Sequence, residues 1–246
     1  LPANNANLIG SPSWTPGQNG GAISLSGTGQ YGTTPDEASL DIAGAITLAA
    51  WIRPGRQATQ DLIKKATMDA TDGYELSLAS ADSSSPAPKK VFVRFNQATS
   101  GNAYRVNSQS DYPYDGSTWM HVAATYDGAT IRLYINGIEE SSMAASTAIG
   151  LNNVPLSIGG QHDGQRLFQG ALDQVRVYNR ALSAEEVARL VGDTVPPSGL
   201  NCTDLNTKPA TASTADKPQS KVWQYAGEWW AVFPTNASGA SSSGTW

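Results

Sequence analysis

The chain has few of the residues that crosslink, charge or anchor a protein. It contains one cysteine, Cys202, in 246 residues, so neither an internal disulfide nor a cysteine-based metal site can form. Charged residues make up only 15% of the chain, against about 25% in a typical soluble domain. No run reaches the roughly 18 apolar residues that a bilayer-spanning helix needs. We therefore predict no membrane span.

The charge of the chain argues against nucleic acid and anionic membranes as partners, and its histidines and acids do not form a catalytic pattern. A net charge of −5 repels polyphosphates, so neither nucleic acid nor an anionic membrane surface is an expected partner. The two histidines, His121 and His162, have no serine elbow or phosphate loop beside them in the sequence. No predicted strand carries acids at alternate positions, and the adjacent pair Glu139-Glu140 would point to opposite faces of a strand. We predict that the chain is not an enzyme.

What the chain does contain is short alternating segments separated by turn residues. Ile46 to Arg53, Trp119 to Tyr126 and Gly170 to Tyr178 alternate as half-buried strands do. Asp127-Gly128 and Asn136-Gly137 are the dipeptides of tight hairpin turns. Turn residues recur about every ten positions, which predicts an all-β antiparallel sandwich of two sheets.

The end of the sandwich is marked by one helix. Ser183 and Glu186 form a capping box, Val187 and Leu190 follow at helical spacing, and Gly192 ends the helix. We predict a sandwich over residues 1–192, a Thr/Pro/Ser-rich linker over 193–220 and a Trp-rich β-hairpin segment over 221–246. That segment either starts a second β domain, packs on the sandwich, or adds a strand to another chain.

Three segments together resemble a known family. Leu48 to Ile52, Trp119 to Gly137 and Ile158 to Ser183 are similar, in this order and spacing, to the laminin-G-like jelly roll of the concanavalin-A superfamily. The resemblance covers most of residues 20 to 192 and implies a two-sheet jelly-roll sandwich. Within it we expect Trp51 and Trp119 to be core aromatics on facing strands.

The resemblance also implies a structural calcium ion between an early loop and Asp173. Calcium takes six to eight oxygen ligands. The early loop offers no acid, so the backbone carbonyls of Gly27, Thr28 or Gln30 would have to supply oxygens beside Asp173. The alternative is that Asp173 caps a turn by hydrogen bonds. Both interpretations stay open.

A carbohydrate surface is the second implied site. Sugar sites combine aromatic faces with a few planar polar side chains. The loops and strands offer such residues as candidate contacts, namely Arg94, Asn96, Tyr104, Asp111, Tyr112, Tyr114, His162, Asp163 and Arg166. The alternative is that Tyr112 and Tyr114 cover a sandwich edge while Arg94 and Arg166 are solvated.

The function that follows from the resemblance is binding without catalysis. We predict a lectin-like, carbohydrate-binding module of a secreted, multidomain bacterial protein, acting on a polysaccharide or glycan outside the cell or on its surface. The alternative is a structural, adhesion or virion-surface protein that assembles with another protein chain through its Trp-rich C-terminus. Fold alone does not decide between them.

Overall fold

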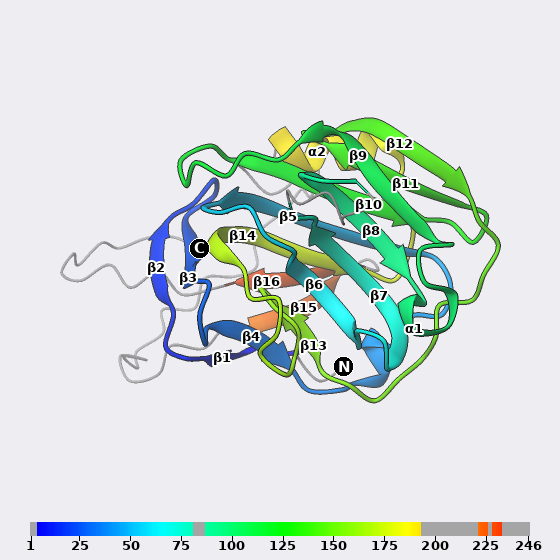
Figure 1. Cartoon of the computed structure of the whole chain (residues 1–246), viewed down its shortest axis with the longest axis horizontal. Coiled ribbons are helices and arrows are strands. Elements are labelled where there is room, and N and C mark those ends of the chain that lie inside the picture. The colour runs from blue at the N-terminus through cyan, green and yellow to red at the C-terminus, as the bar shows by residue number, and fades with distance from the viewer. Residues whose placement is uncertain (1–3, 81–86, 193–220, 226–227, 233–246) are drawn as a thin grey trace, which may run out of the picture.

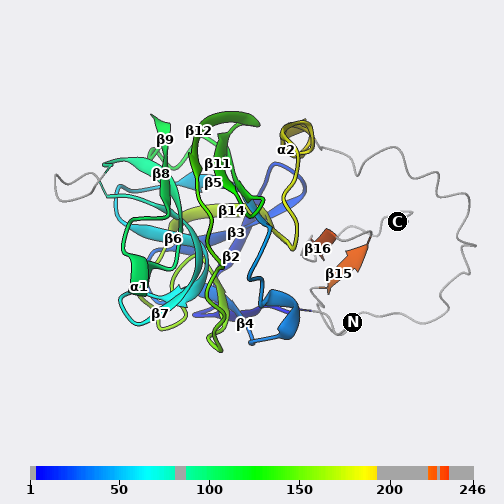
Figure 2. The ribbon, with the colours of Figure 1, turned by 90° about the vertical axis from the view of Figure 1, so that its right-hand side faces the viewer.

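The computed structural model describes residues 4–80, 87–192, 221–225 and 228–232, the last two as backbone only. The chain folds into two antiparallel sheets of seven strands each, which lie face to face (Figures 1 and 2). This confirms the predicted jelly-roll sandwich. None of the described helices is long and apolar enough to cross a membrane.

The first sheet, called sheet A here, is built around a meander. Its strands in spatial order are β1 (Asn7–Ile9), β4 (Tyr31–Thr34), β13 (Leu156–Ile158), β6 (Gln60–Thr67), β7 (Thr71–Leu78), β8 (Lys90–Phe95) and β9 (Arg105–Asp111). β13 comes from far along the chain and inserts between β4 and β6. Its insertion brings the loop that follows it beside the meander.

The second sheet, sheet B, holds the chain's longest strands at its centre. Its order is β12 (Ile138–Ala144), β11 (Thr130–Ile135), β10 (Met120–Tyr126), β5 (Ile46–Pro54), β14 (Gln169–Tyr178), β3 (Gly21–Ser26) and β2 (Ser13–Pro16). The Asn136-Gly137 turn joins β11 to β12. Both of its residues have positive φ, 49° and 81°, as the predicted hairpin turn requires.

The core fills the space between the sheets with apolar side chains from alternate strand positions. Ala50 and Ile52 of β5 both belong to it and are fully buried. Because successive side chains on a strand point to opposite faces, Trp51 must point outward. Its ring packs edge-on against His121, with the centroids 5.3 Å apart. The prediction that Trp51 is a core aromatic is therefore wrong.

Trp119 is also outside the core. Its ring is only partly buried, and the guanidinium of Arg53 lies over it, 5.0 Å from the ring centroid. The next residue, Met120, is the one that joins the core. Trp119 therefore shares the outer face of sheet B with Trp51, because Met120 takes the inward position.

Helices are short and lie outside the sheets. They are η1 (Ala38–Leu40), α1 (Gln97–Ser100) and α2 (Ala184–Gly192). The predicted capping box of α2 is confirmed: the Ser183 N–H donates to Glu186 Oε2 at 2.8 Å, and the Glu186 N–H donates to Ser183 Oγ at 3.3 Å. Val187 and Leu190 pack on the outer face of sheet B.

The C-terminal segment contains the predicted hairpin. β15 (Lys221–Tyr225) pairs with β16 (Glu228–Val232) in antiparallel register. The β16 backbone comes near β14, on the side of sheet B that carries α2 (Figure 2). The predicted linker, 193–220, lies outside the described residues. Whether residues 221–246 begin a further domain stays a prediction.

Candidate functional site

The outer face of sheet A carries a row of polar side chains that crosses five strands. Ser157, Lys64, Glu75, Arg94 and Arg105 stand directly opposite one another on β13, β6, β7, β8 and β9. Partners in register share one face of a sheet. We call this set the polar row.

A second row lies beside the polar row on the same face. Asp61, Ser77, Phe92 and Asn107 are partners in register on β6, β7, β8 and β9. The Ser77 hydroxyl donates to Asp61 Oδ1 at 2.9 Å. The Phe92 ring lies under Arg105, whose Cζ is 3.8 Å from the ring centroid. Phe92 is 1% exposed, so its face is covered by the guanidinium.

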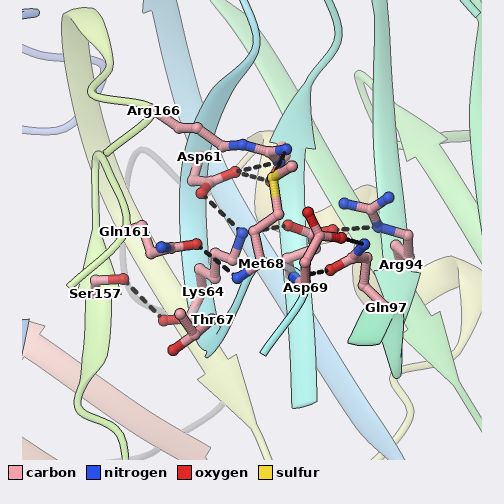
Figure 3. A network of polar contacts seen from close by, with 12 residues as sticks. Asp61, Lys64, Thr67, Met68, Asp69, Arg94, Gln97, Ser157, Gln161 and Arg166 are labelled. Carbon is pink, nitrogen blue, oxygen red and sulfur yellow. Dashed lines mark hydrogen bonds and ion pairs between the residues drawn. The ribbon is translucent and has the colours of Figure 1, made fainter. Parts of the chain in front are cut away.

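Buried ion pairs hold these rows together (Figure 3). Lys64 Nζ lies 3.1 Å from Asp61 Oδ2 and 2.9 Å from Glu75 Oε2, as ion pairs rather than well-aligned hydrogen bonds. The other Glu75 oxygen accepts a hydrogen bond from Arg94 Nε. Arg94 Nη1 donates to Asn102 Oδ1 at 2.9 Å. Buried charges persist only when they are paired in this way.

The two acids of the cluster respond differently to their surroundings. Burial raises the pKa of the Asp61 carboxyl, and the nearby Lys64 charge only partly opposes that rise. Burial acts in the same direction on Glu75, but the charges of Lys64 and Arg94 outweigh it and hold the pKa of Glu75 below its ordinary value. Glu75 is therefore the more firmly ionised of the two.

Two loops close over the cluster and leave a shallow hollow. Arg166, from the loop between β13 and β14, reaches to 3.9 Å from Asp61 and contacts the Met68 sulfur (Figure 3). The Asp69 N–H donates to Gln97 Oε1 at 2.6 Å on the opposite side. The hollow is too shallow to enclose a water molecule, and the residues around it include Lys64, Thr67, Met68, Glu75, Arg94 and Gln97.

The structure brings only some of the predicted sugar contacts to this face. Arg94 and Arg166 belong to the cluster just described. His162 lies at its border, where its Nε2 is 2.8 Å from Thr67 Oγ1. Asp163, in the same loop, accepts a hydrogen bond from Gln161 at 2.8 Å.

Other predicted contacts have structural roles. Tyr112 is 1% exposed, and its hydroxyl donates to the Ala79 carbonyl at 2.9 Å. Asn96 is 7% exposed, and its amide group bonds the backbone of Ala148 and Gly150. Neither side chain reaches the outer face, because each satisfies backbone groups inside the fold. The prediction that they contact a sugar is corrected accordingly.

The remaining three predicted contacts are scattered. Tyr104 packs partly buried against the core. Asp111 pairs with Lys90 at 2.6 Å on the β8–β9 edge. Tyr114 is 48% exposed in the connection that leads to β10. Tyr104 thus faces the core, whereas Asp111 lies on the outer face of sheet A, because its partner Lys90 alternates with Phe92 and Arg94 on β8.

The residues predicted to bind calcium do not lie close together either. Asp173 Oδ2 accepts hydrogen bonds from the Gln18 and Asn19 N–H groups at 2.7 and 2.9 Å, and Oδ1 accepts one from Gln174. Its pKa is raised by burial, which these bonds partly oppose.

The early loop lies at another point of β14. Ser26, which precedes Gly27, is paired with Gln169, four positions from Asp173, or about 13 Å along the strand. Gly27, Thr28 and Gln30 therefore lie apart from Asp173, which caps a turn. Among the residues that the structure describes, no group of three or more His, Cys, Asp or Glu side chains could hold a metal ion.

A family model agrees with this architecture. The model described as the concanavalin A-like lectin/glucanases superfamily matches residues 26–188. The chain belongs to this superfamily. Among curated proteins, the chain is 25% identical over 169 residues to adhesion G-protein coupled receptor V1 of Danio rerio and 22% identical over 174 residues to usherin of Rattus norvegicus. The matches cover 66% and 68% of this chain but only 3% of each relative.

Solved structures share the superfamily fold. The binding domain of Paraclostridial mosquitocidal protein 1 matches with a TM-score of 0.60 and 20% identity, over 76% of this chain and 47% of that one. Domain 4 of an extracellular arabinanase from Geobacillus stearothermophilus, in complex with arabinotriose, matches with a TM-score of 0.58 and 18% identity, over 76% and 87%. The binding domain of botulinum neurotoxin serotype G matches with a TM-score of 0.58 and 15% identity, over 77% and 46%.

Proposed function

We propose that this chain is a non-catalytic carbohydrate-binding module whose saccharide lies on the outer face of sheet A. The observation that carries the proposal is the polar row, in which buried Ser157, Lys64, Glu75 and Arg94 lead in register across the sheet to the partly exposed Arg105. Membership of a superfamily described by lectins and glucanases supports it. The arabinanase domain, whose structure holds arabinotriose, has the same fold.

The chemistry of the face suits sugar hydroxyls. Asn102, which accepts a hydrogen bond from the buried Arg94, is exposed, and Gln97 and Arg105 are partly exposed. These are planar groups that donate or accept hydrogen bonds in fixed directions. Asn102 is held by Arg94, Gln97 by Asp69 and Arg105 by Asn107, so little conformational entropy is lost when a ligand binds.

Catalysis is left out of the proposal because of Lys64. Asp61 and Glu75 point to the same side from neighbouring strands, and both lie within ion-pair distance of one ammonium. Their oxygens are thus no more than about 6 Å apart, a separation that retaining glycosidases use. Here, however, the ammonium lies between the acids, which are 0% and 2% exposed. A glycosidic bond has no place between them.

The setting of the module is also proposed. Its matched relatives include an adhesion receptor, and the arabinanase that contains a similar domain is extracellular. The chain spans about 3% of the curated relatives it matches. These likenesses support a module of a larger secreted protein that acts outside the cell.

A glycan array and a polysaccharide pull-down, each run with calcium and with a chelator, test the proposal. We expect selective retention that falls when Gln97 and Asn102 are both replaced by alanine. The control is Ser142→Ala, an exposed position on sheet B. Retention that falls on chelation would add a calcium requirement.

Two results would contradict the proposal. If the folded protein retains no glycan, the module does not bind carbohydrate, and protein–protein adhesion becomes the function to test. If reducing ends accumulate in the presence of a retained glycan, and a Glu75→Gln variant stops this release, the chain is an enzyme.

A further inference from the structure

Arg105 has an incomplete set of partners. It lies partly buried over Phe92, and its Nε donates to Asn107 Oδ1 at 2.8 Å. Its Nη2 is buried and has no hydrogen-bond acceptor. Among the described residues no acid forms an ion pair with it, whereas Arg94 pairs with Glu75. Buried polar groups in native proteins nearly always have partners, so an unfilled donor indicates a missing water, ion or ligand.

The cluster around Arg105 also carries more positive than negative charge. Lys64, Arg94, Arg105 and Arg166 supply positive charge, while Asp61 and Glu75 supply negative charge. Asp69 lies at the rim, where it is bonded to Gln97. Burial and the neighbouring charges of Arg94 and Arg166, partly opposed by Glu75, together lower the pKa of Arg105 to about 10. The face therefore has room for an added negative charge.

The aromatic surface of this face is not free for stacking. The guanidiniums of Arg105 and Arg94 lie 3.8 and 5.4 Å from the Phe92 ring centroid. A sugar ring cannot reach Phe92 without displacing them. Recognition here must then come from charge and hydrogen bonds, and a guanidinium matches the planar, two-oxygen geometry of a carboxylate.

We propose that the saccharide bound on sheet A is acidic, and that its carboxylate pairs with the guanidinium of Arg105, a partly exposed residue between Arg94 and Asn107. This inference rests on the proposed function, since it names the class of glycan that the face takes. It assigns Arg105 as the residue that distinguishes acidic from neutral glycans. The ion pairs of Lys64 and Glu75 then serve to hold Arg94 in place.

The test compares acidic glycans with neutral copies of themselves. Glycans that carry galacturonic, glucuronic or sialic acid are presented beside the same glycans after reduction of the carboxyl group to an alcohol. We expect retention of acidic forms, a loss of at least about tenfold in affinity on reduction, and a similar loss for Arg105→Gln. Arg132→Gln is the matched control, since Arg132 is a paired arginine on β11 of sheet B.

A stability measurement separates ligand binding from a structural role. If Arg105 binds an anion, an acidic glycan raises the melting temperature of the wild type and not that of Arg105→Gln, whatever the substitution does to the ligand-free protein, because Arg105 also packs on Phe92. An acidic glycan that stabilises Arg105→Gln as much as the wild type would overturn the inference.

Failure of the inference differs from failure of the proposed function. Equal retention of acidic and reduced glycans, unaffected by Arg105→Gln, overturns the acidic ligand but keeps the carbohydrate-binding module. No retention of either form by the folded protein overturns both.

Discussion

At the scale of single residues, the sandwich buries two consecutive lysines, and each of them lies between two carboxylates. Lys64 Nζ pairs with Asp61 and Glu75 on the outer face of sheet A. Lys65 Nζ pairs with Asp36 and Asp41, at 2.7 and 2.9 Å. Successive residues of a strand point to opposite faces, so the two clusters lie on the two sides of β6. Each lysine is tolerated because its own acids neutralise it.

Replacing Lys64 by methionine should therefore be costly. The change leaves Asp61 and Glu75 buried and facing each other, which we expect to cost about 3 to 5 kcal/mol of unfolding free energy at pH 7. Their folded-state pKa values would rise above the unfolded values, so the loss should shrink as pH falls and the carboxylates take up protons. Urea unfolding at pH 7 and pH 4.5 measures both effects.

Lys90→Met is the matched control. Lys90 pairs with Asp111 at 2.6 Å, but that pair is largely exposed, and such pairs contribute about 0 to 1 kcal/mol. Equal losses of unfolding free energy in the two variants would show that the buried pairs of Lys64 stabilise the fold no more than an exposed ion pair does.

His121 should make stability depend on pH. Burial, with a smaller effect from Arg176, lowers its pKa to about 3. In the unfolded chain the pKa is about 6.5, so protons bind the unfolded state more tightly and stability falls as pH drops below about 6.5. Between pH 7 and pH 4 this residue alone should cost about 3 kcal/mol.

Unfolding of the wild type and of His121→Gln across this range isolates that contribution, because the carboxylates titrate in both proteins. We expect the two stability curves to converge toward pH 4. Parallel curves would mean that His121 is accessible to protons in the folded state.

At the scale of elements, α2 is attached by few side chains. Val187 and Leu190 pack with Ala49, Ala123 and Tyr134 on the outer face of sheet B. The rest of α2 is mostly exposed. The helix thus depends on these two contacts and on its capping box.

Leu190→Ala should cost about 2 to 5 kcal/mol of unfolding free energy, because it removes a buried side chain and leaves a cavity under the helix. Chemical denaturation measures the loss. Arg189→Ala, on the exposed side of α2, should change stability little. Glycan retention should not change in either variant, since α2 lies on the other sheet. A loss of retention with Leu190→Ala would argue against a site on sheet A.

Sequence patterns predicted elements better than they predicted the site. Alternation and turn dipeptides identified the strands, and the Ser183–Glu186 pair identified α2, because these signals are local. The inward side of a strand was harder to predict: Trp51 looks like core until Ala50 and Ile52 are known to face inward.

The polar row escaped prediction for a related reason. A search for paired acids within one strand misses Asp61 and Glu75, which meet only once β6 and β7 are placed in register. Arg94 and Arg166 were predicted as planar polar groups, yet Lys64 was not, because a lysine in a strand gives no sign of burial. The clue in the sequence was charge inside an otherwise apolar strand, at Asp61 and Lys64, with Glu75 on the next strand.

At the scale of the whole molecule, both sheets and the core between them are completed within residues 4–192. A chain that ends at residue 192 should therefore keep its circular dichroism spectrum and a single cooperative unfolding transition. Loss of cooperative unfolding would show that residues 193–246 are part of the folded unit rather than an attached segment.

The two buried lysines of β6 also bear on how accurately the sheets assemble. If β6 slipped by one residue against β7, Lys64 and Lys65 would exchange faces, and each ammonium would lose its own carboxylates. Such a misaligned chain would hold uncompensated charges in a dry interior. Pairing in the wrong register is thus penalised at two adjacent residues of the strand, which favours the native register of the sheet.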